Sequence, residues 1–212
     1  MAGYLLSLIW LADFSDYDGL FMMCQIDSKK MLLDFIEADR KALGIENTLK
    51  NLIFNNVWKY QRNLRKLEYV INCKKPKLAR FYYRYKLKRL GSRLGFSIPP
   101  NVFGPGLAIA HIGPIIVNSA ARIGANCRIH VCVNIGTAAG HEFKAPTIGN
   151  NCYIGPGVKM FGDITIGDNV AFGANAVVNK SFPDGNCTLG GIPAKIISEK
   201  TSNGFLVQAW PL

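Results

Sequence analysis

The sequence predicts a parallel β-helix of triangular cross-section, preceded by an α-helical region. Two patterns predict it: apolar residues recur every six positions in the second half of the chain, and at helical spacing in residues 27–95. The charge divides in the same way. Residues 1–100 hold 18 Lys or Arg and 9 Asp or Glu, whereas residues 101–212 hold 7 and 5. The two halves are therefore expected to be built differently.

Three apolar stretches at helical spacing make up the helical region, residues 27–95. The first follows a plausible N-cap at Asp27-Ser28, and Gly44 is a plausible stop. The second opens after Asn47-Thr48 and runs until Pro76, which cannot continue a helix. The third covers residues 78–94.

Residues 1–26 form an N-terminal extension whose relation to the rest is uncertain. Its apolar run Tyr4–Leu11 is far shorter than the roughly 20 residues that span a bilayer. No Lys or Arg precedes Lys29, so a secretory signal is not indicated. Met22 or Met23 is an alternative start.

The period of six is neither that of an α-helix nor that of an ordinary strand. It fits a coil of three flat faces with six residues each, in which one aliphatic residue per face points inward and a small residue packs beside it. Glycine after the aliphatic residue suits tight corners with unusual backbone angles. A phase break of one residue is expected between Gly136 and Thr147. The inward series is Val117, Ile123, Ile129, Ile135, Ile148, Ile154, Met160, Ile166, Phe172 and Val178.

Composition excludes several classes of protein. Hydrophobic residues make up 49% and charged residues 18%, which is a globular rather than a disordered composition. The six cysteines include no C-x-x-C pair, and the chain is too long for a small disulfide scaffold. We therefore expect reduced thiols in a cytoplasmic protein, with Cys127 and Cys152 at packing positions.

Three stretches resemble the left-handed hexapeptide-repeat acyltransferases: Gly106–His111, the repeats from Ile148 to Val178, and Gly191-Ile-Pro-Ala-Lys195. The chain looks most like the serine acetyltransferase branch and, within it, like proteins that acetylate cell-surface saccharides. The resemblance covers residues 96–200, followed by a tail at 201–212. It implies acetyl-CoA as co-substrate and a homotrimer, possibly a dimer of trimers.

The resemblance implies that His111 is the catalytic base. A hydroxyl is too weakly acidic to ionise at neutral pH, and histidine titrates near that pH. The tight, apolar surroundings of His111 are expected to desolvate the ring and keep it neutral. The alternative is a core histidine, because position 111 falls in the inward series of six.

The other two histidines are candidates for acceptor binding. His130 follows an inward residue, so it lines an acceptor cleft or lies on the surface. His141 and Glu142 lie in the out-of-phase segment, which could form a lid or a solvated loop. A zinc site made of three histidines is disfavoured by their spacing, and no metal is expected.

Coenzyme A is expected in the groove between adjacent prisms, as the resemblance implies. Lys180 and Lys195 could meet its 3′-phosphate as point charges. Pro156 has no N–H to donate there. The remaining groove positions are Gly136, Thr137, Gly173 and Ala174.

Three positions depart from the serine acetyltransferase pattern. Phe96, Ala110 and Ala145 stand where that branch carries a carboxylate paired with the catalytic histidine, an aspartate and a second histidine. A site poor in carboxylates suits a neutral sugar hydroxyl better than an amino acid. We therefore predict a saccharide O-acetyltransferase. The alternatives are serine O-acetylation and a trimeric scaffold without catalysis.

Residues 59–93 are strongly basic, with thirteen Lys or Arg and one acid, Glu68. A solvated helical face is the plainest interpretation. Attraction to an anionic membrane surface or to an acidic glycan is the next, so a peripheral position at the inner membrane face is possible. Nucleic acid is not expected as a partner, because no recognition motif accompanies the charge.

Overall fold

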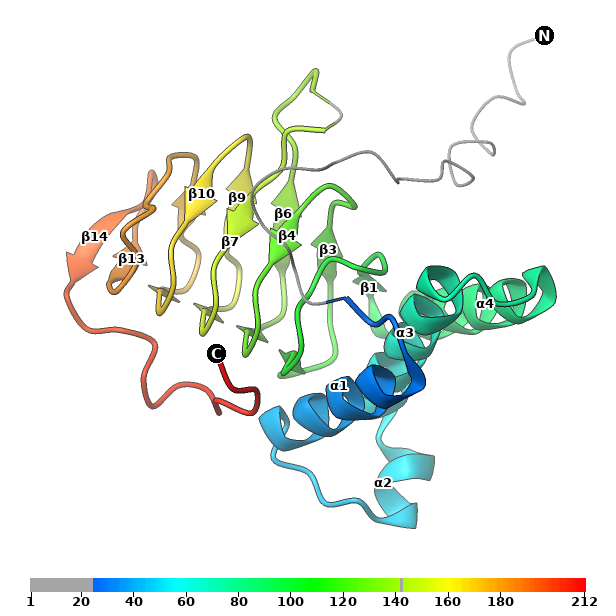
Figure 1. Ribbon diagram of the computed structural model, residues 1–212. Coiled ribbons are helices and arrows are strands. Elements are labelled where there is room, and N and C mark those ends of the chain that lie inside the picture. Colours follow the sequence, from blue (N-terminus) through cyan, green and yellow to red (C-terminus); the bar gives the residue numbers. More distant parts are fainter. Residues whose placement is uncertain (1–24, 142) are drawn as a thin grey trace, which may run out of the picture.

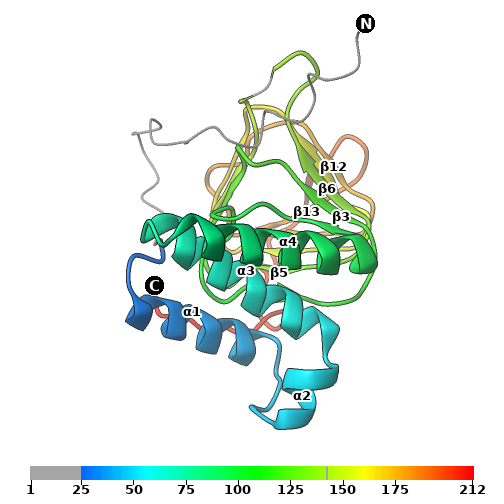
Figure 2. The same cartoon turned by 90° about the vertical axis from the view of Figure 1, so that its right-hand side faces the viewer.

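The computed structural model describes residues 25–141 and 143–212. They form a bundle of helices at one end of a stack of short strands (Figure 1). Viewed along the stack, the coils have a triangular outline, and helices α3 and α4 lie across its end (Figure 2). Residues 1–24, and with them the expected alternative start at Met22 or Met23, lie outside the described residues.

The helices begin and end close to the positions that the sequence predicts. Helix α1 spans Lys29–Ala42, and the side chain of Ser28 accepts a hydrogen bond from the Met31 N–H, as an N-cap does. Helix α4 spans Lys77–Leu94 and ends at Gly95, whose φ of 79° is accessible to glycine without strain.

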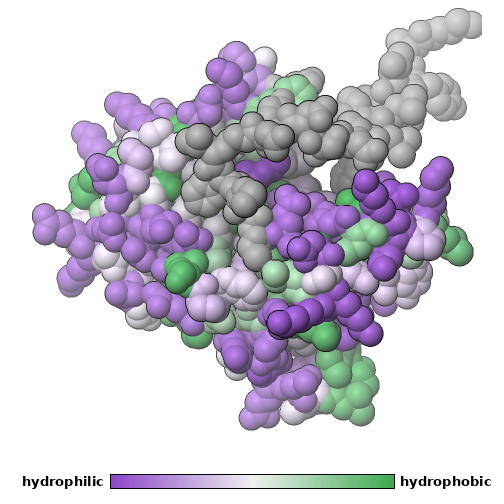
Figure 3. Space-filling model, viewed as in Figure 1, coloured by the Kyte–Doolittle hydropathy of each residue, from purple (hydrophilic) through white to green (hydrophobic). Residues whose placement is uncertain are grey.

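The second predicted stretch is divided into two helices. Helix α2 spans Leu49–Phe54 and helix α3 spans Asn56–Asn72. Asn55 lies between them in extended conformation, and its side chain caps α3 by accepting from the Trp58 N–H at 2.9 Å. The prediction of one continuous helix was wrong because this cap starts a new helix. Helix α2 leaves apolar side chains exposed at the tip of the helical end (Figure 3): Leu49, Ile53 and Phe54.

The strands form three parallel sheets, one for each face of the prism. The first sheet contains β1 (Phe96–Ser97), β3 (Ile115–Val117), β6 (Val133–Gly136), β9 (Lys159–Phe161) and β12 (Val177–Val178). The second contains β4 (Arg122–Ile123), β7 (Thr147–Ile148) and β10 (Thr165–Ile166). The third contains β2 (Ala108–Ile109), β5 (Arg128–Ile129), β8 (Tyr153–Ile154), β11 (Ala171–Phe172), β13 (Thr188–Gly190) and the antiparallel β14 (Lys195–Ser198). The fold is a left-handed parallel β-helix, as predicted.

The inward series predicted from the period of six is buried throughout. Ile123, Ile129, Ile135, Ile148 and Ile154 have no measurable exposure, and Val178 closes the series in the same state. The core continues without interruption into helix α3 through Tyr60 and Leu64. The β-helix and the helices therefore share one hydrophobic core.

The glycines that follow the inward residues do not have the unusual backbone angles that the sequence predicts. Gly124, Gly149 and Gly167 do not have positive φ. Instead, a Cβ on Gly149 would lie 2.8 Å from the backbone of Gly167 in the next coil, and a Cβ on Gly124 equally close to Gly149. These glycines let consecutive coils approach. The left-handed corner positions are taken by asparagines, among them Asn126, Asn151, Asn169 and Asn186.

The phase break is the insertion of a projecting loop. Ile148 pairs with Ile166 across one regular coil, whereas Ile123 pairs with Ile148 across a coil that is clearly longer. The longer coil exceeds the regular one by one full period of six and one further residue. The insertion therefore appears in the sequence as a phase break of one residue. Residues 137–141 and 143–144 belong to the loop at the top of Figure 1.

The C-terminal tail returns along the prism to the helices (Figure 1). It lies beside a ladder in which the side chains of Asn126, Asn151, Asn169 and Asn186 are hydrogen-bonded in series. Asn126 holds the tail by accepting from the Trp210 N–H at 2.8 Å. The Trp210 ring packs edge-on against Phe35 of α1, with ring centroids 5.4 Å apart.

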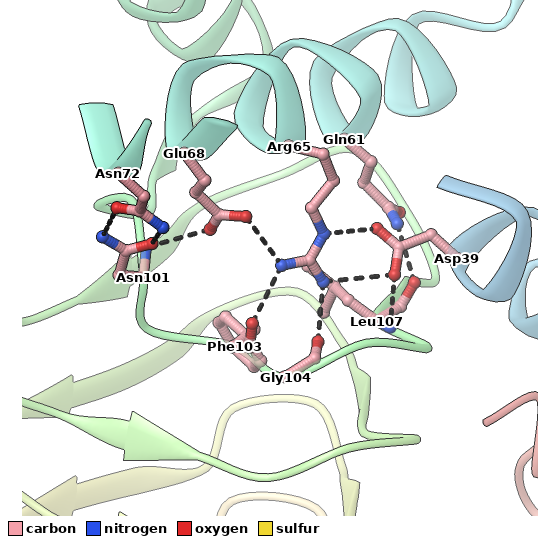
Figure 4. A network of polar contacts seen from close by, with 9 residues as sticks. All are labelled: Asp39, Gln61, Arg65, Glu68, Asn72, Asn101, Phe103, Gly104 and Leu107. Carbon is pink, nitrogen blue, oxygen red and sulfur yellow. Dashed lines mark hydrogen bonds and ion pairs between the residues drawn. The ribbon is translucent and has the colours of Figure 1, made fainter. Parts of the chain in front are cut away.

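A buried ion network joins the helices to the first coil (Figure 4). Arg65 of α3 donates to Asp39 of α1 at 2.8 Å and to Glu68 at 3.0 Å, and all three side chains are buried. Arg65 also donates to the carbonyls of Phe103 and Gly104, which belong to the first coil. Burial raises the pKa of Asp39, against the lowering effect of Arg65. The helices are thus fixed to the β-helix by charge as well as by apolar packing.

No helix within residues 25–141 and 143–212 is long and apolar enough to cross a bilayer.

Candidate active site

One corner of the prism carries two of the three histidines. His111 follows β2 and His130 follows β5, the adjacent strand of the same sheet. Their ring centroids lie 5.6 Å apart. The row continues with Tyr153 of β8, 5.0 Å from His130, and with Phe205 of the tail, 5.3 Å from Tyr153. An imidazole pair is therefore flanked by aromatic rings on the outer surface of one sheet.

His111 is exposed, so the alternative of a core histidine is wrong. The physical reason is a longer first coil. The pairing of Ile109 with Ile129 encloses more of the chain than the regular pairing of Ile148 with Ile166. Ile109 therefore takes the inward place that the period of six assigns to position 111. The expected desolvation of the His111 ring is also absent within one chain, because Ile112 beside it is 57% exposed.

His130 is half-buried and lies in a positive environment. Burial lowers its pKa, and Arg128 and His111 lower it further. The Nε of Arg128 donates to Nε2 of His130 at 3.5 Å, which requires that nitrogen to be unprotonated. The His130 ring is thereby held in the neutral form.

The candidates in the inserted loop remain apart from this corner. His141 is exposed, and its N–H donates to the Ala138 carbonyl within a turn of the loop. Glu142 lies outside the described residues. Across the part of the chain that the structure describes, no three His, Cys, Asp or Glu side chains are grouped closely enough to hold a metal ion.

Several residues expected to bind coenzyme A share the corner with His111. Backbone hydrogen bonds stack Ala110, His130, Gly155 and Gly173 in consecutive coils, each N–H donating to the next strand. Pro156 and Ala174 follow the last two of these and are exposed or half-buried. Gly190 continues the column and pairs with Lys195 of β14. The column thus runs from the strand before His111 to that of Lys195 over five strand spacings, about 24 Å.

Gly155 is required in this column by the close approach of the next coil. A Cβ there would lie 2.4 Å from the carbonyl oxygen of Phe172. Gly155 is itself buried, so the surface of this corner is formed by Pro156 and Ala174, which are exposed, and by the half-buried Gly173. An extended ligand could lie along these residues.

Gly136, Thr137 and Lys180 lie where the strands of the first sheet end, whereas His111 lies where these strands begin. Gly136 ends β6, and Lys180 follows β12 of the same sheet. One short strand, about 10 Å, separates this corner from that of His111. A single protomer therefore does not bring the expected coenzyme A residues into one cluster.

The three positions that depart from the serine acetyltransferase pattern are occupied by apolar side chains. Phe96 is buried and packs edge-on against Tyr60 at 5.0 Å, so it contributes to the core. Ala145 is buried as well. No hydrogen bond from the described residues reaches the His111 ring. The expected carboxylate partner is not replaced within the described part of the chain.

Arg128 and Tyr153 were not singled out from the sequence. Each directly precedes an inward isoleucine, at Ile129 and Ile154, so the period of six places both side chains outside the prism. The position of Tyr153 beside His130 depends on the stacking of coils across the inserted loop, which the sequence does not specify.

Comparison with known proteins agrees with the fold and repeats. Residues 145–180 match the family described as bacterial transferase hexapeptide (six repeats). The matched stretch begins just before β7 and ends just after β12, so the likeness covers part of the prism.

Similar proteins of known name are serine acetyltransferases. The chain is 34% identical to the serine acetyltransferase of Synechococcus elongatus over 57% of its own length and 53% of the relative's. It is 28% identical to that of Buchnera aphidicola over 84% of this chain and 66% of the other. A crystal structure of Neisseria gonorrhoeae serine acetyltransferase in complex with serine is similar with a TM-score of 0.62 and 25% identity, covering 81% of this chain and 71% of that one. The chain spans about half the length of the first relative.

Proposed function

We propose that this protein is an acetyl-CoA-dependent O-acetyltransferase that uses His111 as general base. The observation that carries the proposal is the corner column, in which the exposed His111 stands at one end of a surface that includes Pro156 and Ala174, and Lys195 stands at the other. The repeat family and the names of the relatives support the same chemistry.

The chemistry is a direct transfer. His111 takes the proton of the acceptor hydroxyl as its oxygen attacks the thioester carbonyl. The N–H groups of Gly155 and Gly173 donate to the carbonyls of Phe172 and Leu189, so the donors that stabilise the oxyanion must come from other groups. Collapse of the tetrahedral intermediate expels the thiolate, which receives the proton. No acyl-cysteine is needed, and Cys127 and Cys152 are buried.

The active unit is proposed to be a homotrimer. In one chain the expected coenzyme A residues occupy two corners, and packing of prisms side by side would bring unlike corners together. Ile112 and Ile116 are 57% and 50% exposed on the corner and face beside His111. A neighbouring prism over these side chains would bury them and desolvate the imidazole.

Serine is the first acceptor to test, because the similar proteins are named for it. This reverses the preference for saccharides that the sequence suggested. A saccharide hydroxyl remains the second candidate on one observation: Phe96, Ala110 and Ala145 provide no charge to bind an amino acid. The rings of the His130–Tyr153 row could instead face a sugar.

The test is release of free thiol from acetyl-CoA with each acceptor. Rapid turnover with L-serine supports the first acceptor and excludes the saccharide preference. Turnover with hexose or amino-sugar glycosides, but not with serine, supports the second. Failure to bind coenzyme A by calorimetry would contradict the transferase proposal and favour a non-catalytic scaffold.

A further inference from the structure

A basic hollow lies between helices α2, α3 and α4. Its volume is about 440 Å³, within the range of small-molecule sites. The residues that line it are Leu52, Lys59, Arg62, Asn63, Lys66, Lys86, Arg89, Leu90 and Arg93. Six of these side chains are cationic and none is acidic.

The cations form two facing rows. On α3 they stand at 59, 62 and 66, and on α4 at 86, 89 and 93, so each row follows one helical face. The short connection 73–76 joins the two helices into a hairpin. The start of α3 therefore meets the end of α4, and Lys66 faces Lys86.

The ion pairs of the described residues leave these six cations unpaired. The pairs involve Arg40, Lys41, Arg65 and Lys144 instead. The one acid of α3 and α4, Glu68, is buried against Arg65. Arg62 and Lys86 contact the rings of Trp58 and Tyr82, which position the cations without neutralising them.

Unpaired like charges on facing helices raise the free energy of the folded chain. The strain is visible at Lys66, which is half-buried: burial lowers its pKa, and Arg62 and Lys86 lower it further. An anion seated between the rows would remove this repulsion and gain charge-assisted hydrogen bonds from both helices.

We propose that the hollow binds the phosphate groups of a small, multiply phosphorylated anion. Three arginines and three lysines facing inward from two helices match several clustered phosphates better than one carboxylate. The concave shape favours a compact ligand over a flat bilayer, because Lys59, Arg62 and Lys66 are half-buried at its floor. None of the residues that line the hollow is among those proposed for acetyl transfer.

The experiment is calorimetric titration of the purified full-length chain with inorganic tripolyphosphate. The test variant is R62Q/R89Q, which removes one cation from each row. The matched control is K77Q/K88Q, which removes two exposed charges of α4 outside the hollow. We expect R62Q/R89Q to weaken binding by about tenfold or more, with K77Q/K88Q close to the unmodified chain. Circular dichroism melting verifies that both variants are folded.

A second readout follows from Lys66. Since its pKa is lowered in the free hollow, binding of an anion should cause proton uptake at alkaline pH. Titration in two buffers of different ionisation enthalpy measures that uptake, which K66Q should abolish. Acetyl-CoA turnover without tripolyphosphate should be the same in all variants.

Vesicles distinguish the sources of phosphate. Binding to vesicles that carry a phosphorylated inositol lipid, lost in R62Q/R89Q and competed by tripolyphosphate, would identify a lipid headgroup as the source. Binding of tripolyphosphate without such vesicle binding would identify a free ligand. Equal loss in both double variants, or binding only to phosphatidylserine vesicles without competition, would overturn the proposal in favour of bulk charge attraction.

Discussion

The rings of His111 and His130 lie 5.6 Å apart at one corner of consecutive coils. A positive charge on either ring opposes a charge on the other, and Arg128 adds a third cation beside His130. Burial, Arg128 and His111 together lower the pKa of His130, so the His130 ring is biased toward the neutral imidazole.

Replacing His111 by alanine should abolish transfer while coenzyme A still binds. General-base catalysis contributes typically about 10²–10⁴-fold, so a loss of that size in kcat is expected. Free-thiol release measures transfer, and calorimetry measures coenzyme A affinity. His130→Ala serves as the neighbouring control and should alter KM for the acceptor more than kcat. An H111A protein with unchanged turnover would remove this residue from the mechanism.

Arg128→Gln should raise the pKa of His130, because a cation and a hydrogen bond that require the neutral ring are removed. The pKa is measured from the chemical shift of the imidazole C–H in NMR titrations. Burial still lowers the His130 pKa in the variant, so the rise should be partial.

The pH dependence of the free energy of unfolding follows from the direction in which the His130 pKa is shifted. The pKa of His130 in the folded chain lies below its ordinary value of 6.5, so the unfolded chain binds the proton more readily. The stability contribution is fully present above pH 6.5 and is lost as the pH falls below it. Between neutral and mildly acidic pH, R128Q should therefore lose less stability than the unmodified chain does. An unchanged pKa would show that Arg128 does not act on this ring.

Arg65→Met should destabilise the protein by about 3–5 kcal/mol, since it leaves Asp39 and Glu68 as buried, unpaired carboxylates. Urea unfolding measures the loss. Arg40→Gln is the control, because its pair with Glu37 is partly exposed and should be worth about 1 kcal/mol or less.

The deficit of R65M should shrink on acidification. The pKa values of Asp39 and Glu68 are raised by burial, and loss of Arg65 raises them further. The folded variant then binds protons more readily than the unfolded chain, so its stability should rise from about pH 7 to about pH 5. A deficit independent of pH would mean that packing, and not charge, accounts for it.

Trp210→Ala should weaken the attachment of the tail and cost about 2 kcal/mol, as loss of a partly buried aromatic side chain. Hydrogen exchange of residues 203–212 should accelerate in the variant. Leu212→Ala is the matched control, because Leu212 is 71% exposed in the same segment. Equal exchange in the two variants would show that the Phe35 contact does not hold the tail.

The sequence predicts the β-helix because the period of six is set by burial, and burial leaves a direct trace in residue type. Ile148, Ile154 and Val178 each occupy the inward position that the spacing assigns. Helix caps are equally local, so the N-cap expected at Asp27-Ser28 is found at Ser28. Asn55 was missed because an asparagine inside an apolar helical pattern is not by itself a break.

The site was less predictable, because it depends on register between coils of unequal length. The longer first coil turns His111 outward, and the inserted loop sets the register that brings Tyr153 beside His130. A period counted along the chain shows neither the outward position of His111 nor the pairing of coils that places Tyr153 beside His130. The partners of Arg65 are far from it in the sequence, as Gly104 is, and no local pattern connects them.

The contact between Trp210 and Phe35 links the last residues of the chain to its first described helix. Stacked repeats contact mainly their neighbours, so an open array can fray from a free end one coil at a time. Here the final coil cannot peel away without releasing α1, and α1 in turn is tied through Asp39 to Arg65. Unfolding should therefore be all-or-none across the chain, with coincident transitions for the helices and the last coils rather than a gradual unravelling.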